Sequence, residues 1–181
     1  MERNLTMIAL FAALIAALGL VPKFTLAFGV PITAQSLGVM LCGTVLGAKR
    51  GFLAVALFIL LVAMGLPLLS GGRGGIALFS SPSGGFLIGF PFAAFVTGLV
   101  MEKWRGASVG VTAGVASIVG GIIVLYAFGT VGLSIALDKG LVEAALLNTA
   151  FVIGDVIKAV IAGALTGALA QARPAALLSR A

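Results

Sequence analysis

The sequence contains no histidine, a single cysteine and few charged side chains. Eleven basic and five acidic residues make up 9% of its 181 positions, whereas soluble domains carry about 25% charged residues. Without histidine, and with Cys42 as the sole thiol, the chain lacks the usual nitrogen and sulfur ligands of zinc, haem and iron–sulfur clusters. We therefore expect no metal centre, no cofactor-dependent redox chemistry and no intramolecular disulfide.

Apolar residues dominate the chain instead. They make up 61% of the sequence, and the mean hydropathy is +1.28, which leaves too few polar side chains to cover a soluble surface. A membrane-spanning helix needs about 20 apolar residues. Apolar stretches lie at about 5–21, 34–48, 52–66, 86–101, 108–130 and 144–170. The sequence therefore predicts an all-α integral membrane protein, with residues 1–181 forming a single domain of six transmembrane helices.

The basic residues are unevenly shared between the two predicted sides of the membrane. If both termini are cytoplasmic, seven lie inside: Arg3, Lys49, Arg50, Lys103, Arg105, Arg173 and Arg180. Three lie outside: Lys23, Arg73 and Lys139. This imbalance favours the N-in, C-in orientation. It also accounts for most of the net charge of +6 without a nucleic-acid partner.

Small residues recur at four-residue spacing, which places them on one face of a helix. Glycines show this spacing at Gly43/Gly47/Gly51, Gly85/Gly89, Gly106/Gly110/Gly114 and Gly163/Gly167. Such faces let helices approach closely in lipid, either within the chain or between copies in a homo-oligomer. The first helix carries Ala9, Ala13 and Ala17 at the same spacing. That alanine face either packs inside the bundle or docks another membrane protein.

The segment Gly154-Asp155-Val156-Ile157-Lys158 places two ionisable residues near the middle of the last apolar stretch. Charges at membrane depth are costly and usually mark a ligand or ion pathway. At positions i and i+3, the carboxylate and the ammonium share one helix face and can neutralise each other. A purely structural ion pair is the alternative, although two apolar residues would fill that role at lower desolvation cost.

The connection at 67–85, named here the lid segment, is long and rich in helix-breaking residues. It holds six glycines, two prolines and four serines, which prevent it from continuing a helix. It also contains the apolar run Ile76-Ala77-Leu78-Phe79, which favours burial. On the predicted topology it lies outside, where it can cover a cavity; a flexible linker is the alternative. No GxxxxGK[ST] motif for ATP is present anywhere in the chain.

A third group of polar residues lies at the outer end of the second predicted span. Pro31 precedes Thr33, Gln35 and Ser36, and proline suits the start of a helix. These neutral donors and acceptors fit a ligand without a large charge. Capping of the helix end is the alternative for Thr33, but it explains Gln35 poorly.

Together these segments resemble the BioY family, the biotin-specific substrate-capture (S) components of energy-coupling factor (ECF) transporters. The resemblance spans nearly the whole chain. It is carried by 31–39 (PITAQSLGV), by Gly65-Leu66-Pro67 with 70–75 (SGGRGG), by 82–90 (PSGGFLIGF) and by 154–158 (GDVIK). The sequence departs from the family pattern at Ser81 and Ser83, and at Ile153, where the family often has proline.

The resemblance implies a six-helix S-component bundle in the bacterial inner membrane that binds biotin from outside and delivers it inward. It implies a transmembrane coupling protein and ABC-type ATPase subunits as partners, with Ala9, Ala13 and Ala17 as the docking face. We expect Asp155 to accept from the ureido N–H groups of biotin and Lys158 to donate to the ureido carbonyl or the carboxylate tail. The other expected contacts are Thr33, Gln35, Ser36, Gly71, Gly72, Arg73, Gly74, Gly75 and Ser83.

Three other functions remain as alternatives. A capture protein for thiamine or riboflavin shares the class, but thiamine is cationic, and one tyrosine and one tryptophan offer little ring stacking. A membrane enzyme needs a nucleophile with a base, or metal-binding carboxylates, and only Asp155 lies deep in a span. A pore-forming or scaffold subunit would use the same glycine faces. No catalytic residue is expected.

Overall fold

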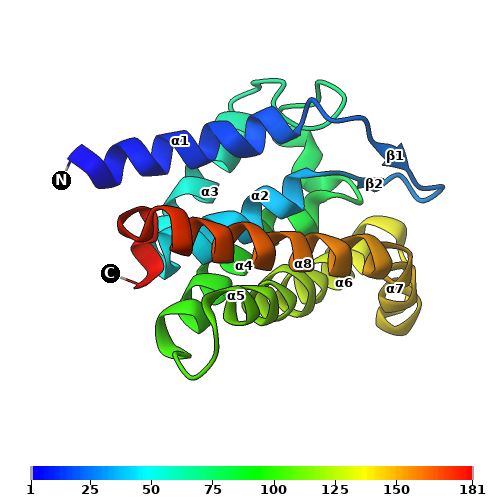
Figure 1. Cartoon of the computed structure of the whole chain (residues 1–181). Helices are drawn as coiled ribbons and strands as arrows, with labels where there is room; N and C mark the ends of the chain where they lie inside the picture. Colours follow the sequence, from blue (N-terminus) through cyan, green and yellow to red (C-terminus); the bar gives the residue numbers. More distant parts are fainter. Residues whose placement is uncertain (1, 181) are drawn as a thin grey trace.

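The computed structural model describes residues 2–180, and most of them are helical (Figure 1). The elements in chain order are α1 (Glu2–Leu18), β1 (Phe24–Thr25), β2 (Pro31–Ile32), α2 (Gln35–Leu41), α3 (Ala48–Ala63), α4 (Gly84–Lys103), α5 (Val109–Ile118), α6 (Leu125–Leu137), α7 (Leu141–Leu147) and α8 (Thr149–Ala172). Two π-helical segments, Cys42–Leu46 and Val119–Val124, continue α2 and join α5 to α6. Short 3₁₀ turns lie at Ile76–Ser80, Pro174–Ala176 and Leu178–Arg180.

Each of the six predicted apolar stretches contains a helical segment, but several boundaries differ. The second and third segments are separated only by Gly47, whose positive φ of 85° turns the chain between them. The fifth runs to Leu137 rather than to 130. The sixth is broken at Asn148, so α7 and α8 are separate helices. As a result Asp155 lies in the second turn of α8, not near the middle of a span.

Among residues 2–180, three helical segments are long and apolar enough to cross a membrane: Gly84–Lys103, Val109–Leu137 and Thr149–Ala172. The helices α1 and α3 have 17 and 16 residues, near the lower limit of about 17 for a span. The second segment, Gln35–Leu46, is shorter still. Apolar side chains also cover the outer faces, for example Ile135 and Ile153. Helices that are apolar on all sides are typical of an integral membrane protein.

A short antiparallel hairpin connects α1 to α2. Phe24 pairs with Ile32, and Thr25 pairs with Pro31. Pro31 therefore belongs to a strand, and the prediction that it begins the second helix is wrong. The helix begins at Gln35, whose backbone N–H donates to the Thr33 hydroxyl over 3.3 Å. Thr33 thus satisfies one of the free donors at this helix end.

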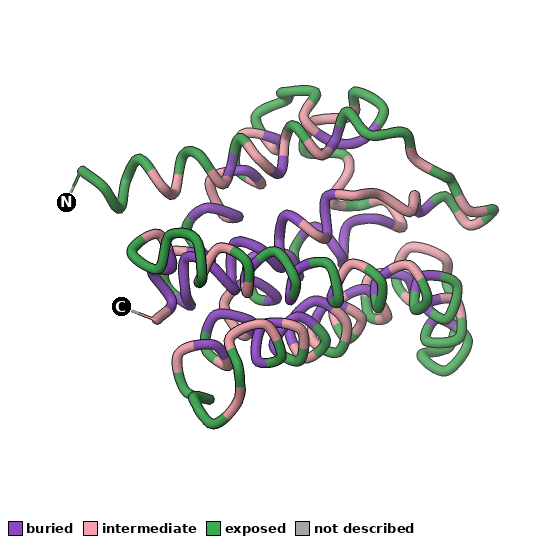
Figure 2. The backbone as a smooth tube through the Cα atoms, viewed as in Figure 1, coloured by how far each residue is buried: buried purple, intermediate pink, exposed green. Residues whose placement is uncertain are grey.

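The repeated glycines bring helices together within the chain. A Cβ atom on Gly85 of α4 would lie 2.7 Å from the Cα of Gly132 on α6, and one on Gly163 of α8 would lie 2.8 Å from the carbonyl oxygen of Gly110 on α5. Even an alanine methyl group would therefore clash. In Figure 2 the buried backbone lies where these helices meet, and exposed residues follow the outer faces. Close packing therefore explains the glycines at Gly85 and Gly163, whereas Gly106 lies before α5 and Gly114 has no atom closer than 3.8 Å to such a Cβ.

Candidate functional site

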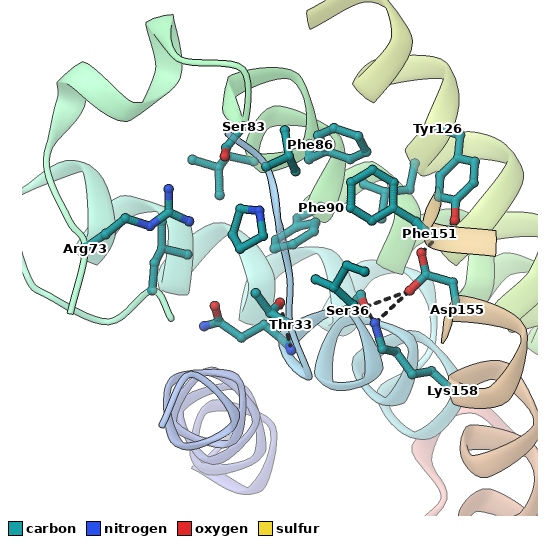
Figure 3. A pocket seen from close by; sticks show the side chains of 17 residues that line it. Thr33, Ser36, Arg73, Ser83, Phe86, Phe90, Tyr126, Phe151, Asp155 and Lys158 are labelled. Carbon is teal, nitrogen blue, oxygen red and sulfur yellow. Dashed lines mark hydrogen bonds and ion pairs between the residues drawn. The ribbon is translucent and has the colours of Figure 1, made fainter. Parts of the chain in front are cut away.

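A cavity lies between α2, α4, α6, α8, the β2 hairpin and the lid segment (Figure 3). Its empty space, counted out to and including its opening, is about 560 Å³. Its wall is mainly apolar, and its polar residues are Thr33, Gln35, Ser36, Arg73, Ser83, Tyr126, Asp155 and Lys158. Seven of these eight were predicted as site residues; Tyr126 was not.

A hydrogen-bonded cluster of four side chains forms one side of the cavity. The Lys158 Nζ lies 2.8 Å from the Asp155 Oδ1, and it also donates to the Ser36 hydroxyl over 2.9 Å. The Ser36 hydroxyl donates to the same Oδ1 over 3.2 Å. The other carboxylate oxygen, Oδ2, accepts from the Tyr126 hydroxyl over 2.8 Å. The carboxylate is therefore held in one orientation by donors from α2, α6 and α8.

The cluster still has hydrogen-bonding capacity to offer a ligand. An ammonium group has three donors, and Lys158 uses two of them within the cluster. A carboxylate has about four acceptor positions, of which Asp155 fills three. One donor of Lys158 and one acceptor position on the Asp155 Oδ2 therefore remain. Such a pair matches a ligand group that presents a carbonyl oxygen beside an N–H.

Aromatic rings line the middle of the cavity. Phe86 and Phe90 of α4 lie one helical turn apart, and Phe151 lies one turn before Asp155 on α8. The Phe86 and Phe151 rings meet edge to face, with 5.7 Å between their centroids. Tyr126 meets Phe151 in a similar way at 6.4 Å. This wall suits an apolar body that bridges two polar ends.

Arg73 and Ser83 lie on the other side of the cavity from the charged cluster (Figure 3). The Arg73 Nε donates to the Ser70 carbonyl over 3.3 Å. Burial lowers the pKa of the Arg73 guanidinium from its usual value, but a guanidinium stays protonated at neutral pH. The Ser83 hydroxyl is buried and has no hydrogen-bond partner within the described residues. This side therefore offers a cation and an unused hydroxyl.

Gln35 borders the cavity, but its amide is already occupied. The Nε2 donates to the carbonyl oxygens of Ile15 and Leu68, both over 3.1 Å, and the Oε1 accepts from the Ser70 N–H over 3.1 Å. Both amide donors are thus used within the protein. Gln35 therefore has no free amide N–H to offer a ligand, and its predicted contact with a ligand stays a prediction.

The four predicted glycines of the lid segment lie outside the cavity wall. Gly71, Gly72 and Gly75 have φ of 79°, 69° and 105°, a backbone conformation that other residues rarely adopt. A Cβ atom on Gly74 would meet the Leu66 carbonyl oxygen. These glycines allow the tight turn that carries Arg73, rather than lining the cavity themselves.

The alanine face of α1 does not take part in the cavity, because none of its three alanines lines the cavity wall. Ala9, Ala13 and Ala17 are exposed, whereas Ala12 and Ile15 face the bundle. The alternative that this face packs inside the bundle therefore does not hold. Its role in docking stays a prediction.

Sequence reasoning missed Tyr126 and the phenylalanines of the cavity. Phe151 could have been found, because it precedes Asp155 by four residues and therefore shares its helix face. Tyr126 is the sole tyrosine of the chain and lies within a long apolar stretch, but its bond to Asp155 depends on how the continuous helix Val109–Leu137 is placed against α8. Within residues 2–180 no group of three or more histidine, cysteine or acidic side chains could hold a metal ion.

The sequence and the fold are both similar to those of known proteins. The model of the BioY family matches residues 2–175. The biotin transporter BioY of Rhodobacter capsulatus is 51% identical over 189 aligned residues, which cover 99% of this chain and 100% of that protein. The biotin transporter BioY of Rhizobium etli is 52% identical over 178 residues, or 95% of each chain. The crystal structure at 2.1 Å of the S-component for biotin from an ECF-type ABC transporter has a TM-score of 0.88 to this fold, with 32% identity over 94% of this chain and 92% of that one.

Proposed function

The chain belongs to the BioY family, and from this premise we propose that it is the biotin-binding membrane component of a vitamin uptake transporter. Its relatives are named as biotin transporters, and the similar crystal structure is an S-component for biotin. The cavity provides polar groups at two sides and an aromatic wall between them. Biotin has the matching parts: a ureido ring, an apolar bicyclic body and a carboxylate tail.

We propose one orientation for biotin in the cavity. The ureido group binds the charged cluster, where Lys158 donates to the carbonyl oxygen and Asp155 accepts from an adjacent N–H. The bicyclic body lies against Phe86, Phe90 and Phe151. The carboxylate reaches Arg73 on the other side of the cavity, close to the unpartnered hydroxyl of Ser83. This arrangement uses the free donor and acceptor of the cluster.

The observation that carries the proposal is the charge of the cavity wall. Arg73 and Lys158 are cationic, and Asp155 is the single anion among the lining residues, so the wall has a net charge of +1. Biotin is a monoanion at neutral pH and restores neutrality. Thiamine is a cation and would add to the positive charge, which is costly in a poorly solvated site. Riboflavin is neutral and leaves the Arg73 charge without a partner.

The transport arrangement follows from the same premise. We propose that six segments cross the bacterial inner membrane with both termini in the cytoplasm, α2 with its π-helical continuation being the short second crossing. The cavity and the lid segment then face outward. A transmembrane coupling protein docks on Ala9, Ala13 and Ala17 of α1, and ABC-type ATPase subunits supply energy, since the chain has no nucleotide-binding motif of its own.

Binding of radiolabelled biotin to the purified chain in lipid nanodiscs tests the proposal. We expect saturable binding of one biotin per chain, displaced by unlabelled biotin and not by thiamine or riboflavin. Displacement by thiamine or riboflavin would reassign the vitamin. Absence of any binding, in a sample that is monodisperse and helical by circular dichroism, would favour a scaffold or pore-forming subunit instead.

Replacement of Arg73 by Gln is expected to weaken biotin binding by about 10- to 100-fold, because a hydrogen bond to a charged group contributes about 1.5–3 kcal/mol. The methyl ester of biotin lacks the carboxylate charge, so its affinity should change far less in the same variant. Calorimetry with both ligands on both proteins measures the difference. An equal loss for biotin and its ester would mean that Arg73 does not bind the tail.

A further inference from the structure

A single buried amide joins three separate parts of the chain. Gln35 is 2% exposed and lies at the first turn of α2. Its Nε2 donates to Ile15 in the last turn of α1 and to Leu68 in the lid segment, and its Oε1 accepts from the N–H of Ser70. Only this orientation of the amide works, because two partners are acceptors and one is a donor.

The bond to Ser70 holds the turn that carries Arg73. Leu69 and Arg73 pair as an antiparallel bridge, with backbone N–H donation in both directions at 3.0 and 3.2 Å. The Ser70 carbonyl oxygen at the base of this turn accepts from Arg73 Nε and from Lys23 Nζ. Ser70 itself is fully buried. The position of Arg73 in the cavity therefore depends on the backbone that Gln35 holds.

Side-chain packing between α1 and this part of the lid segment is incomplete. A cleft lies between them, lined by Ala16, Ala17, Gly19 and Leu20 on one side and by Pro67, Leu68, Leu69 and Gly72 on the other. Hydrogen bonds must therefore supply much of the contact. Gly19 shows how tight the remaining contact is, since a Cβ atom there would lie 2.6 Å from the Leu68 carbonyl oxygen and 3.0 Å from the Gln35 Nε2.

We propose that Gln35 is a latch, a positioning residue that holds the lid segment closed over the cavity and couples it to the end of α1. Its amide keeps the turn at 69–73 in place and so keeps Arg73 in the cavity, without a direct bond to the ligand. Because one of its two donors binds α1, movement of that helix end also loosens the lid segment. This inference rests on the proposed function, since it takes biotin as the ligand.

Two substitutions break the latch from opposite sides. Gln35→Met keeps the length of the side chain and removes all three hydrogen bonds. Gly19→Ala inserts a methyl group between Leu68 and the amide, at a residue that does not line the cavity. Gly114→Ala is the matched control, because the nearest atom to its Cβ lies at an ordinary 3.8 Å. The double variant of Gln35 and Gly19 tests whether both changes disrupt one contact.

We expect each latch variant to release biotin about tenfold faster, with an association rate within about threefold of the parent, because a closed lid acts mainly on a ligand already inside. Stopped-flow binding measures both rates. The double variant should release biotin little faster than the faster single variant, since contacts that share a partner are not additive. The control should match the parent protein.

Hydrogen exchange without ligand separates the latch from the proposed function. In the empty protein, amides at 68–75 should exchange about tenfold faster in both latch variants and at the parental rate in the Gly114→Ala control. This result would support the latch even if the chain did not bind biotin. If exchange at 68–75 were unchanged in Gly19→Ala, and that variant released biotin at the parental rate, the latch would be refuted. Loss of affinity in Gln35→Met alone would then make Gln35 a direct ligand contact.

Discussion

Biotin affinity is expected to fall by about 100-fold or more when Asp155 is replaced by Asn. The carboxylate accepts from Ser36, Tyr126 and Lys158 at 2.8–3.2 Å, and an amide cannot satisfy these donors and also neutralise the ammonium. The remaining acceptor position for a ureido N–H is lost with the charge. Titration calorimetry on the purified variant measures the change.

A structural role for the ion pair predicts a different pattern, and a double variant distinguishes the two. Splitting a buried ion pair costs about 3–5 kcal/mol of stability, because the remaining charge is left uncompensated. Asp155→Asn with Lys158→Met removes both charges and should restore the amount of folded protein in the membrane. We still expect it not to bind biotin. Binding at the parental affinity in this double variant would make the pair purely structural.

The charged part of the site could be predicted because it depends on one helix. Asp155 and Lys158 are three residues apart, so helical geometry alone places them on one face. The ion pair at 2.8 Å follows directly from that spacing. The same reasoning extends to Phe151 on the preceding turn. Charged residues in an apolar stretch also have few structural roles, which is why they indicate function from the sequence alone.

The partners supplied by other helices could not be predicted in this way. Tyr126 binds Asp155 across 29 positions of the chain. It lies at the start of α6, directly after the π-helical segment Val119–Val124, and it is this segment and α5 that pack against α8. Asn148 makes a second contact of this kind, because its side-chain amide donates to the Thr130 hydroxyl over 2.7 Å and joins the break between α7 and α8 to α6. An asparagine in an apolar stretch gives no sign of such a bond.

A buried glutamine such as Gln35 fits two interpretations, a contact to a ligand or contacts within the protein. A neutral amide at membrane depth predicts a polar contact, and it does make three. The partners are backbone groups of α1 and the lid segment rather than free space in the cavity. Backbone acceptors are present at every position of a sequence, so no pattern of residue types can identify which of them an amide will bind.

Energised uptake is expected to be lost when Ala13 is replaced by Trp, while biotin binding stays within about twofold of the parent. Ala9, Ala13 and Ala17 are exposed on the outer face of α1, and the residues that face the bundle are others, such as Ala12 and Ile15. An indole at Ala13 therefore points away from the cavity. It would still prevent the close helix approach that small residues allow in a membrane.

The loss of uptake is measured with radiolabelled biotin in cells that express the chain with its coupling protein and ATPase subunits. The biotin affinity is measured on the purified variant. Ile123→Trp is the matched control, because Ile123 is 60% exposed on the segment between α5 and α6 and adds an indole to a different outer surface. We expect Ala13→Trp to reduce uptake at least about tenfold and to prevent co-purification with the coupling protein, and Ile123→Trp to do neither. Normal uptake by Ala13→Trp would mean that the partner docks elsewhere, whereas lost biotin binding in that variant would mean that the exposed face of α1 is needed for the fold of the cavity.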